Sequence, residues 1–304
     1  MVSRGLDWKR GDRIVVTLLE HHSNLLPWMR LKEEGVEMAT VMLDKEGRLD
    51  LADFEQAITP GTRLVAVSQL SNALGSIIPV KEIASMCRDA GTSLLVDAAQ
   101  SVPHMPVSAK EIDCDFLCFS GHKMLGPTGS GVLWMKSTAG IEPLLAGGGM
   151  VEEVHESGFD IKPGFEGYEA GTPDISAAIG LGAAMDYLSR VGLKEIHDHE
   201  RRLTRRLLAG LAEIKGVRIF GPETAEKRGG VVSFGVDGLL PHEVALMLDQ
   251  TSSIMVRSGH HCCIPLMKHL GLKYGTVRAS LYLYNTIEEV EKLLAALEQI
   301  ARMA

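Results

Sequence analysis

The chain has 304 residues, 45% hydrophobic and 23% charged, a balance typical of a globular protein with room for two domains or one large one. Its formal net charge of −8 argues against nucleic acid or an anionic membrane as a partner. The sequence contains no apolar run long enough to span a bilayer, no signal-peptide core and an odd number of cysteines, five, so we expect a cytoplasmic protein without a disulfide framework.

The first half of the chain alternates apolar runs, typical of buried strands, with amphipathic stretches, typical of helices. Strands are expected at 13–17, 36–43, 64–68, 93–96, 116–119 and 132–135. Helices are expected from Ser23 or Asn24, at 49–58 and at 79–90. This rhythm predicts an α/β fold with a mostly parallel sheet and helices on both faces.

The second half of the chain has a different pattern. A loop or hairpin at 146–167 is followed by expected helices at 175–190, 193–214, 241–248 and from Thr286, where Thr286 and Glu289 form a capping box. Short strands are expected at 217–220, 231–234 and 253–257. We therefore expect a large domain over 1–191 and a small α+β domain over 192–304.

Polar side chains follow several predicted strands at the point where each strand ends. His21 follows the first strand, Asn72 the third, Asp97 and Gln100 the fourth, and Ser120-Gly121-His122-Lys123 the fifth. Ligands of such sheets bind outside the carboxyl ends of the strands. We therefore expect these side chains to share one site.

Lys123 stands between the apolar run 116–119 and a glycine-rich run at 126–131. At the end of a buried strand, burial disfavours the ammonium form, so the free amine becomes available as a nucleophile, as a Schiff-base lysine requires. A surface lysine at a strand end is the alternative interpretation.

Asp97 follows an apolar run and has two interpretations. One is an N-cap or turn-forming residue. The other pairs it with Lys123, because pyridoxal 5′-phosphate requires an aldehyde-capturing lysine and a carboxylate beside its pyridine nitrogen. Ser120, His122 and nearby backbone N–H groups are then candidates to hold the phosphate.

The segment Arg257–Pro265 contains His260, His261, Cys262 and Cys263 in succession. A zinc site is disfavoured, because adjacent residues of an extended segment point to opposite sides and the usual gap between cysteine ligands is missing. The cysteines are either small core residues or include a thiolate nucleophile activated by nearby imidazoles. Cys87, Cys114 and Cys118 lie in helix or strand patterns typical of packing.

Arg278 lies in an apolar, strand-like run at 276–280. A buried arginine requires an anion. A bidentate clamp on the carboxylate of an amino acid would supply one, and an internal ion pair with an Asp or Glu is the alternative.

Seven motifs together resemble the cysteine desulfurases that work with SUF-type iron–sulfur assembly, and selenocysteine lyases, within the class V aminotransferase family. They run in the family's order and cover nearly the whole chain: Glu20-His21-His22-Ser23-Asn24, Ser71-Asn72-Ala73-Leu74-Gly75, Val96-Asp97-Ala98-Ala99-Gln100, Ser120-Gly121-His122-Lys123 with Gly126-Pro127-Thr128-Gly129, Glu169-Ala170-Gly171-Thr172-Pro173, Arg257-Ser258-Gly259-His260-His261-Cys262, and Arg278-Ala279-Ser280 with Tyr284-Asn285-Thr286. The resemblance implies the fold of PLP-dependent transferases of type I, with a seven-stranded type of sheet.

The resemblance also implies a role for each matching residue. As catalytic residues it implies Lys123, which forms the Schiff base, His21, which stacks on the ring, and Cys262, which accepts the sulfur. The implied cofactor-binding residues are Lys123, Asp97, His21, Asn72, Gln100, Ser120, His122 and Thr172, the last reaching the cofactor of a partner subunit. The implied substrate-binding residues are Arg278, Asn72 and Arg257, and no metal ligand is implied.

The implied activity is a PLP-dependent conversion of L-cysteine to L-alanine that leaves a persulfide on Cys262. The implied partners are a second copy of the chain, in a homodimer, and a separate SUF-type sulfur-acceptor protein that takes the sulfur toward iron–sulfur clusters or other uses. The alternatives are a selenocysteine lyase acting on L-selenocysteine and a cofactor-poor binding or scaffold module.

Two features depart from the family pattern. Cys263 stands where relatives usually carry a small residue without a thiol; it could resolve the persulfide, form side products or do nothing. Relatives also carry an upstream arm and a Gly-Thr-Thr-type turn that hold the phosphate, and no such stretch precedes Arg13. We therefore expect a large domain that lacks its N-terminal portion, as a fragment or a shortened form, with Ser120 and His122 left to hold the phosphate.

Overall fold

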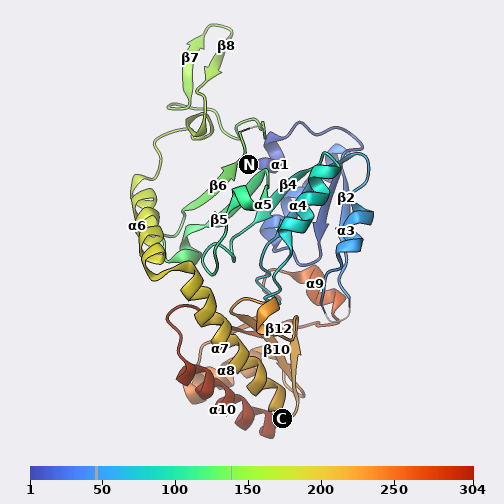
Figure 1. Ribbon diagram of the computed structural model, residues 1–304, viewed down its shortest axis with the longest axis vertical. Helices are drawn as coiled ribbons and strands as arrows, with labels where there is room; N and C mark the ends of the chain where they lie inside the picture. Colours follow the sequence, from blue (N-terminus) through green and yellow to red (C-terminus); the bar gives the residue numbers. More distant parts are fainter. Residues whose placement is uncertain (45–46, 138) are drawn as a thin grey trace.

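A six-stranded sheet forms the centre of the larger body of the molecule (Figure 1). The structure, a computed structural model, describes residues 1–44, 47–137 and 139–304. The strands follow the order β2-β1-β3-β4-β5-β6 and comprise β1 (Arg13–Thr17), β2 (Glu37–Val41), β3 (Thr62–Ser68), β4 (Ser93–Asp97), β5 (Phe116–Ser120) and β6 (Gly131–Met135). The first five are parallel and β6 is antiparallel to β5. The mostly parallel α/β prediction is confirmed, with six strands in the described sheet rather than seven.

Short helices connect these strands and cover both faces of the sheet. They are α1 (Val2–Gly5), η1 (His22–Asn24), α2 (Leu26–Arg30), η2 (Leu31–Glu34), α3 (Leu51–Ala57), α4 (Val80–Asp89), α5 (Ala109–Ile112) and η3 (Gly121–Met124). Successive strand residues point to opposite faces. Val15 of β1 therefore packs in one cluster with Phe54 and Ile83, whereas Ile14 packs on the other face in a cluster with Trp28.

A two-stranded hairpin stands away from the body (Figure 1). It consists of β7 (Val151–His155) and β8 (Gly158–Ile161), within the region 146–167 where a loop or hairpin is expected. The chain then passes through η4 (Phe165–Tyr168) into α6 (Ile175–Val191) and α7 (Leu193–Glu213). Gly192 separates these two helices with a φ of +92°, a conformation that favours glycine.

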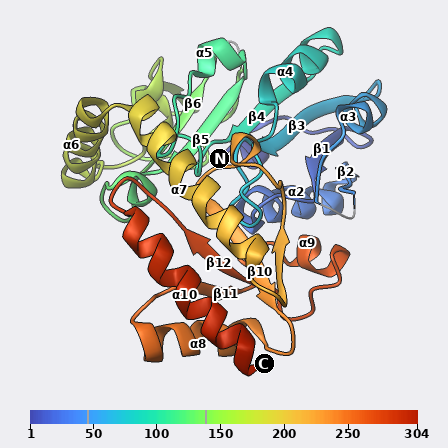
Figure 2. The same ribbon diagram turned by 60° about the horizontal axis from the view of Figure 1, so that its bottom comes forward.

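The C-terminal part of the chain forms an antiparallel four-stranded sheet in the order β11-β12-β10-β9. Its elements are β9 (Val217–Phe220), η5 (Ala225–Lys227), β10 (Val231–Val236), α8 (Pro241–Ser252), β11 (Arg257–Gly259), α9 (Ile264–His269), β12 (Thr276–Ser280) and α10 (Ile287–Met303). Helices α7, α8 and α10 pack beside this sheet (Figure 2), where Leu207, Phe234 and Leu297 are buried in one cluster. The capping box of Thr286 and Glu289 at the start of α10 is confirmed.

The strand expected at 253–257 is wrong. Helix α8 extends to Ser252 and ends at Ser253, which has a left-handed φ of +52°; β11 begins only at Arg257. Ile254 and Val256 suggested a strand because they are apolar. They lie instead in an irregular segment and pack against the cluster that contains Phe234, beside the four-stranded sheet. In the part of the chain that the structure describes, no helix has the length and apolar character needed to cross a membrane.

Helix α9 connects the two bodies. Cys263, Leu266 and Met267 belong to the same buried cluster as Leu19 and Leu74 of the larger body. The segment that follows β11 is therefore packed against the strand ends of the large sheet, which brings Cys262 close to them.

Candidate active site

A cavity of about 560 Å³ lies at the carboxyl end of the large sheet, within the range of about 300–1,000 Å³ typical of small-molecule sites. The predicted site residues that line it are His21, Asp97, Ser120, His122, Lys123 and Arg257. The first five come from the ends of β1, β4 and β5, and Arg257 comes from β11. A larger hollow of about 1,030 Å³ beside β9 contains none of the predicted site residues, so the chemistry points to the smaller cavity.

Five predicted site residues lie outside the lining of this cavity: Asn72, Gln100, Thr172, Cys262 and Arg278. Asn72, Cys262 and Arg278 are grouped beside it, as described below. Gln100 is half-buried in the turn after β4, and Thr172 is exposed between the hairpin and α6.

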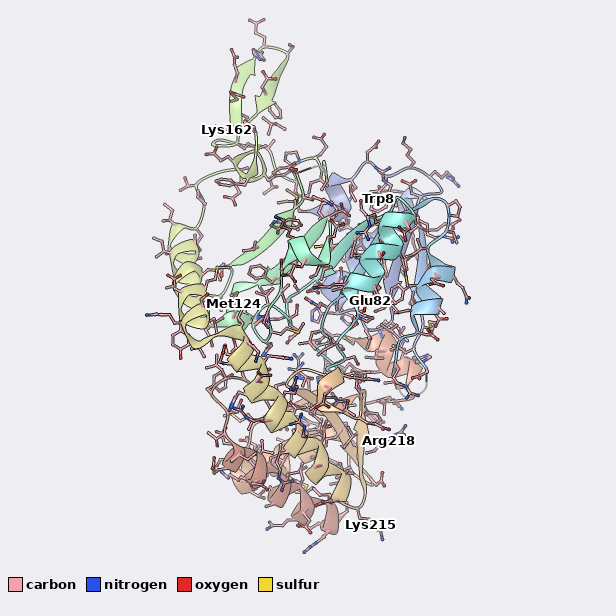
Figure 3. The ribbon with its side chains drawn as sticks, in the orientation of Figure 1. Trp8, Glu82, Met124, Lys162, Lys215 and Arg218 are labelled. Atoms are coloured by element: carbon pink, nitrogen blue, oxygen red, sulfur yellow. The ribbon has the colours of Figure 1, made fainter. Side chains whose placement is uncertain are left out.

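The position of Lys123 is set by its neighbours in the turn η3. Met124 is buried among Leu181 and Leu188 of α6, where the large body meets α6 and α7 (Figure 3). Gly126 packs closely on the same turn, because a Cβ there would lie 2.9 Å from the carbonyl oxygen of Gly121. Both contacts fix the backbone that presents the half-buried Lys123 to the cavity.

Asp97 is half-buried, and its carboxylate has unused hydrogen-bonding capacity. Its Oδ1 accepts the N–H of Ala99 at 2.9 Å, and among the described residues no donor is found for Oδ2. Burial raises the pKa of Asp97, while the hydrogen bond from Ala99 and the charge of Lys123 lower it. A cationic group in the cavity, such as a protonated ring nitrogen, would satisfy this carboxylate.

His21 presents a neutral imidazole to the same cavity. Burial lowers its pKa, and the charges of Lys123, His22, Arg257 and Arg278 lower it further. Its Nδ1 accepts the backbone N–H of Ser23 at 3.1 Å, which assigns the ring proton to Nε2. The ring is therefore suited to stack on a planar ligand without adding charge.

Glu20 is a functional candidate that no sequence pattern singled out. Its side chain is 1% exposed and accepts hydrogen bonds from Thr17 Oγ1 at 2.6 Å, Asn24 Nδ2 at 2.6 Å and Ser68 Oγ at 2.7 Å. Burial raises the pKa of Glu20 to about 7 despite these three bonds, and the charge of Asp97 adds to the increase. An acidic residue between the end of an apolar strand and His21 was the signal available in the sequence.

Arg257 and Arg278 form a pair of cations without an anion. They lie directly opposite each other on β11 and β12. Arg278 donates to the carbonyl oxygen of Asn72 at 2.8 Å, and its buried Nε has no partner. Within the described ranges neither guanidinium forms an ion pair with a carboxylate, which disfavours the internal ion pair considered for Arg278. A carboxylate from a ligand would supply the missing anion.

Cys262 lies on a loop with an unusual backbone conformation. His261 and Cys262 have φ values of +53° and +60°, and each such residue costs on the order of 1–3 kcal/mol when it is not glycine. Asn72 stabilises the loop, since its Nδ2 donates to the carbonyl oxygen of His261 at 2.7 Å. The Sγ of Cys262 is 3.8 Å from Nη2 of Arg257, so a guanidinium is the cation beside this thiol.

The imidazole of His261 does not supply that charge. Burial, followed by the charges of Arg278 and Arg257, lowers its pKa to about 3, so the ring is neutral. Its Nε2 lies 2.9 Å from Thr276 Oγ1, whereas Nε2 of His260 lies 3.0 Å from the carbonyl oxygen of Lys273. The two rings thus face different partners, and the structure does not support activation of the thiol by the charge of His261.

Cys263 is buried, unlike its neighbour. It is 0% exposed, its Sγ donates to Asn72 Oδ1 at 3.3 Å, and burial raises its pKa to about 12. Burial likewise raises the pKa of Cys87 and Cys118 to about 12 and that of Cys114 to about 11. These four thiols are poorly suited to act as nucleophiles.

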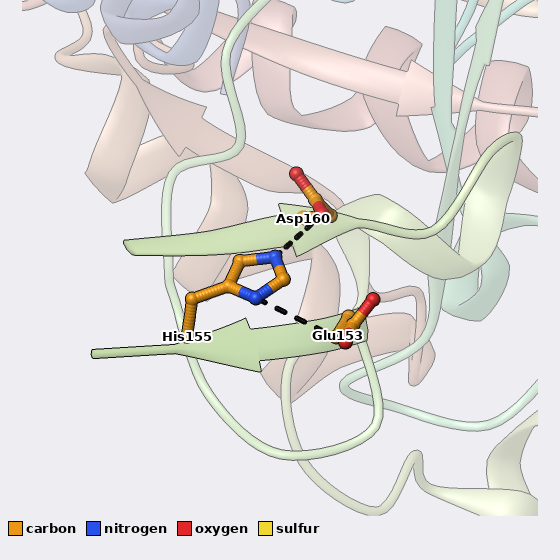
Figure 4. Close-up of side chains that lie close together, drawn as sticks. All are labelled: Glu153, His155 and Asp160. Atoms are coloured by element: carbon orange, nitrogen blue, oxygen red, sulfur yellow. Dashed lines mark hydrogen bonds and ion pairs between the residues drawn. The ribbon is translucent and has the colours of Figure 1, made fainter. Parts of the chain in front are cut away.

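The described residues contain one group of acidic and histidine side chains close enough to hold a metal ion: Glu153, His155 and Asp160, on the exposed hairpin (Figure 4). The imidazole of His155 lies between the two carboxylates, with Nε2 at 3.0 Å from Asp160 and Nδ1 at 3.9 Å from Glu153. Opposite edges of the ring face the two acids, so the imidazole bridges the two carboxylates.

The cavity residues fit pyridoxal 5′-phosphate. Lys123 supplies an amine for its aldehyde, Asp97 a carboxylate oxygen without a donor among the described residues for its ring nitrogen, and His21 a neutral ring for stacking. Ser120 and His122 supply donors for its phosphate in the same cavity. These assignments follow from the chemical group that each side chain supplies and from its position in the cavity.

Comparisons with known proteins agree with this chemistry. Residues 1–293 match the model of the family aminotransferase class-V. A probable cysteine desulfurase from Methanothermobacter thermautotrophicus is 45% identical over 100% of this chain, and one from Pyrococcus abyssi is 48% identical over 99%; the chain spans 76% of the length of each.

Solved structures agree in fold as well. The apo structure of a cysteine desulfurase from Thermococcus onnurineus NA1 matches with a TM-score of 0.95 and 48% identity, and a cysteine desulfurase from Escherichia coli matches with a TM-score of 0.93 and 32% identity. Each match covers 100% of this chain and 76% of the solved one. Together with the lysine–aspartate cavity and the adjacent cysteine loop, these matches show that the chain belongs to the class-V aminotransferase family and has the fold of PLP-dependent transferases of type I.

Proposed function

We propose that this protein is an L-cysteine desulfurase, with pyridoxal 5′-phosphate as its cofactor, that forms L-alanine and a persulfide on Cys262. One observation carries the proposal: a cavity containing Lys123 and Asp97 lies beside two guanidinium groups without anions and a half-exposed thiol. An amino acid whose side chain ends in sulfur matches this combination. The names of the relatives at 45–48% identity support the same activity.

Each residue has a distinct part in the reaction. Bound pyridoxal 5′-phosphate supplies an aldehyde that captures the substrate amine and a ring that accepts electrons from the substrate Cα. Arg278 binds the substrate carboxylate, with Arg257 adding positive charge beside it. Lys123 removes the Cα proton as a general base and returns a proton as the product forms. The Cys262 thiolate attacks the substrate sulfur, forming an S–S bond as the substrate C–S bond breaks; the electron pair of the broken bond stays with the carbon fragment, which takes up a proton to become L-alanine.

Arg257 supports the last step electrostatically. Its Nη2 is 3.8 Å from the Cys262 Sγ, so a cation lies beside the attacking sulfur. Asn72 contributes by holding the loop through His261, and Gln100 is proposed to reach the cofactor or substrate from the turn after Asp97.

The active unit is proposed to be a homodimer with Thr172 directed to the cofactor phosphate of the partner subunit. Large apolar side chains are exposed on the hairpin, on η4 and on α6, with Val154 70%, Phe165 74% and Ile179 69% exposed. An apolar surface of this kind supports association. Light scattering measures the molar mass in solution and so detects the dimer. Thr172→Ala is expected to weaken cofactor binding while the protein remains a dimer.

A sulfur-acceptor protein of the SUF type, serving iron–sulfur cluster assembly in the cytoplasm, is the proposed recipient of the persulfide. The cysteine loop is short and bound to the body of the molecule at His261, which favours delivery to a protein that approaches the loop.

We place the division between the proposed cofactor-binding and cysteine-loop domains at 191/192, where Gly192 separates α6 from α7.

The test is a reconstitution experiment. Purified protein is mixed with pyridoxal 5′-phosphate, its visible absorbance is recorded, and alanine is measured after L-cysteine and a reductant are added. Lys123→Ala is expected to lose the absorbance of the lysine-bound cofactor, and Cys262→Ala to retain it while sulfide release stops. Colourless protein that forms no alanine refutes the proposal, and faster turnover of L-selenocysteine than of L-cysteine indicates a selenocysteine lyase.

A further inference from the structure

His22 connects two parts of the site that are far apart in the sequence. Its backbone N–H donates to the carbonyl oxygen of Cys262 at 2.9 Å, and its ring Nε2 accepts the backbone N–H of Ile264 at 3.2 Å. His22 directly follows His21, which lines the cavity. The loop that carries the thiol is therefore bound, at the Cys262 carbonyl and two residues beyond it, to the segment that carries the ring-facing histidine.

The loop requires such restraint because of its backbone conformation. Two successive residues, His261 and Cys262, have left-handed φ values, which non-glycine residues adopt only when the surroundings impose them. Asn72 holds the carbonyl oxygen of His261 at 2.7 Å, and His22 holds the next carbonyl and the N–H of Ile264. Loss of the ring contact would leave the Ile264 N–H without its partner, and the bond from the His22 N–H to the Cys262 carbonyl oxygen would then alone hold this side of the loop to His22.

The geometry points to His22 as a positioning residue for Cys262 in the sulfur-transfer step, an inference that rests on the proposed function. His22 acts through the loop, since its bonds go to backbone groups of Cys262 and Ile264 rather than to the thiol. By accepting the Ile264 N–H, it keeps the Cys262 Sγ at one distance from the cavity that holds His21 and Lys123. The thiol is thereby presented to the substrate sulfur in a single orientation.

The test compares two replacements of His22 in the holoenzyme. His22→Phe keeps a ring but removes the acceptor, and His22→Gln keeps an acceptor at a similar reach. The first measurement is the rate at which iodoacetamide alkylates Cys262, assigned by peptide mass spectrometry, because the other four thiols are held at raised pKa values by burial. The second is kcat and KM for L-cysteine.

His22→Phe is expected to raise the alkylation rate about 3- to 10-fold, the change in loop opening that one hydrogen bond supports. Its kcat is expected to fall about 10- to 100-fold, with KM within about threefold, because the thiol is misplaced while the substrate-binding groups are not. His22→Gln is expected to remain within about threefold of wild type in both measurements.

His269→Phe is the matched control. His269 Nε2 lies 2.9 Å from the carbonyl oxygen of Leu43, a similar imidazole–backbone bond at the opposite end of α9. His269→Phe removes this bond and so tests whether any loss of an anchor on α9 exposes Cys262. The alkylation of Cys262 in this variant is expected to stay at the wild-type rate.

Wild-type alkylation and kcat in His22→Phe would overturn the inference, as would equal behaviour of the Phe and Gln variants. If His22→Phe does not fold, as judged by circular dichroism, His22→Ala takes its place in the same comparison. Absence of alanine formation by the wild-type protein refutes the proposed function instead, while the alkylation rates, which require no substrate, still decide whether His22 holds the loop.

Discussion

Replacing Glu20 by glutamine tests whether one buried carboxylate makes folding sensitive to pH. Glu20 is 1% exposed and lies where Thr17, Asn24 and Ser68 meet, and Asn24 also lines the cavity. Glutamine preserves the size of the side chain and cannot ionise. The variant therefore removes the titration of this group with little change in packing.

The magnitude follows from the difference between the folded and ordinary pKa values. Folding raises the pKa of Glu20 from 4.5 to about 7, so the folded protein binds the proton more tightly than the unfolded chain. Stability contributed by this group is fully present below pH 4.5 and is lost as the pH rises through about 7. At about 1.4 kcal/mol for each tenfold difference in proton affinity, the loss is on the order of 3 kcal/mol.

Urea unfolding of the cofactor-free protein, followed by tryptophan fluorescence at about pH 5 and about pH 8, measures this effect. Other groups titrate over the same interval, so the quantity of interest is the unfolding free energy of Glu20→Gln minus that of wild type. This difference is expected to rise by about 2–3 kcal/mol from the lower to the higher pH. A difference that stays constant within about 1 kcal/mol would show that burial does not raise the pKa of Glu20.

Two further predictions concern the cysteine loop and the substrate anion. Cys263→Ala is expected to lower the free energy of unfolding by about 1–2 kcal/mol, because it removes a buried side chain and its bond to Asn72; urea unfolding measures this. Mass spectrometry of the enzyme during turnover is expected to find the added sulfur on Cys262 in both the wild type and the Cys263→Ala variant. Added sulfur on Cys263 of the wild type would contradict the buried, protonated state inferred for that thiol. Arg278→Lys is expected to raise KM for L-cysteine about tenfold or more with a smaller change in kcat, because lysine lacks the planar fork that binds a carboxylate. Steady-state kinetics measures both constants, and an unchanged KM would assign the carboxylate to another residue.

Much of the fold could be read from local patterns in the sequence. The large-sheet strands and the long helices α6, α7 and α10 lie close to their predicted ranges, because hydrophobic periodicity and capping residues act over a few neighbouring positions. The strand expected at 253–257 failed because apolar residues in an irregular segment also pack into a core, and periodicity does not separate the two cases.

The candidate site was predictable to a similar extent. The rule that ligands bind at the carboxyl ends of parallel strands predicted that His21, Asp97 and Lys123 would be neighbours, and the cavity contains all three. The network around Glu20 was not predictable as a whole: Thr17 and Asn24 are within four positions of it, but Ser68 becomes close only when β1 and β3 pair.

The contrast between Cys262 and Cys263 marks the limit between sequence and tertiary structure. The sequence by itself determined that two thiols follow a glycine-containing loop, and that a lysine and an aspartate end neighbouring strands. Only the tertiary structure decided which thiol can react. The backbone at Cys262 has a left-handed conformation, and this thiol is half-exposed beside Arg257. The thiol of Cys263 is buried against Asn72. The charge beside Cys262 comes from five positions away, but the burial of Cys263 depends on Leu19 and Asn72, more than 180 positions away in the chain, and no local pattern encodes it.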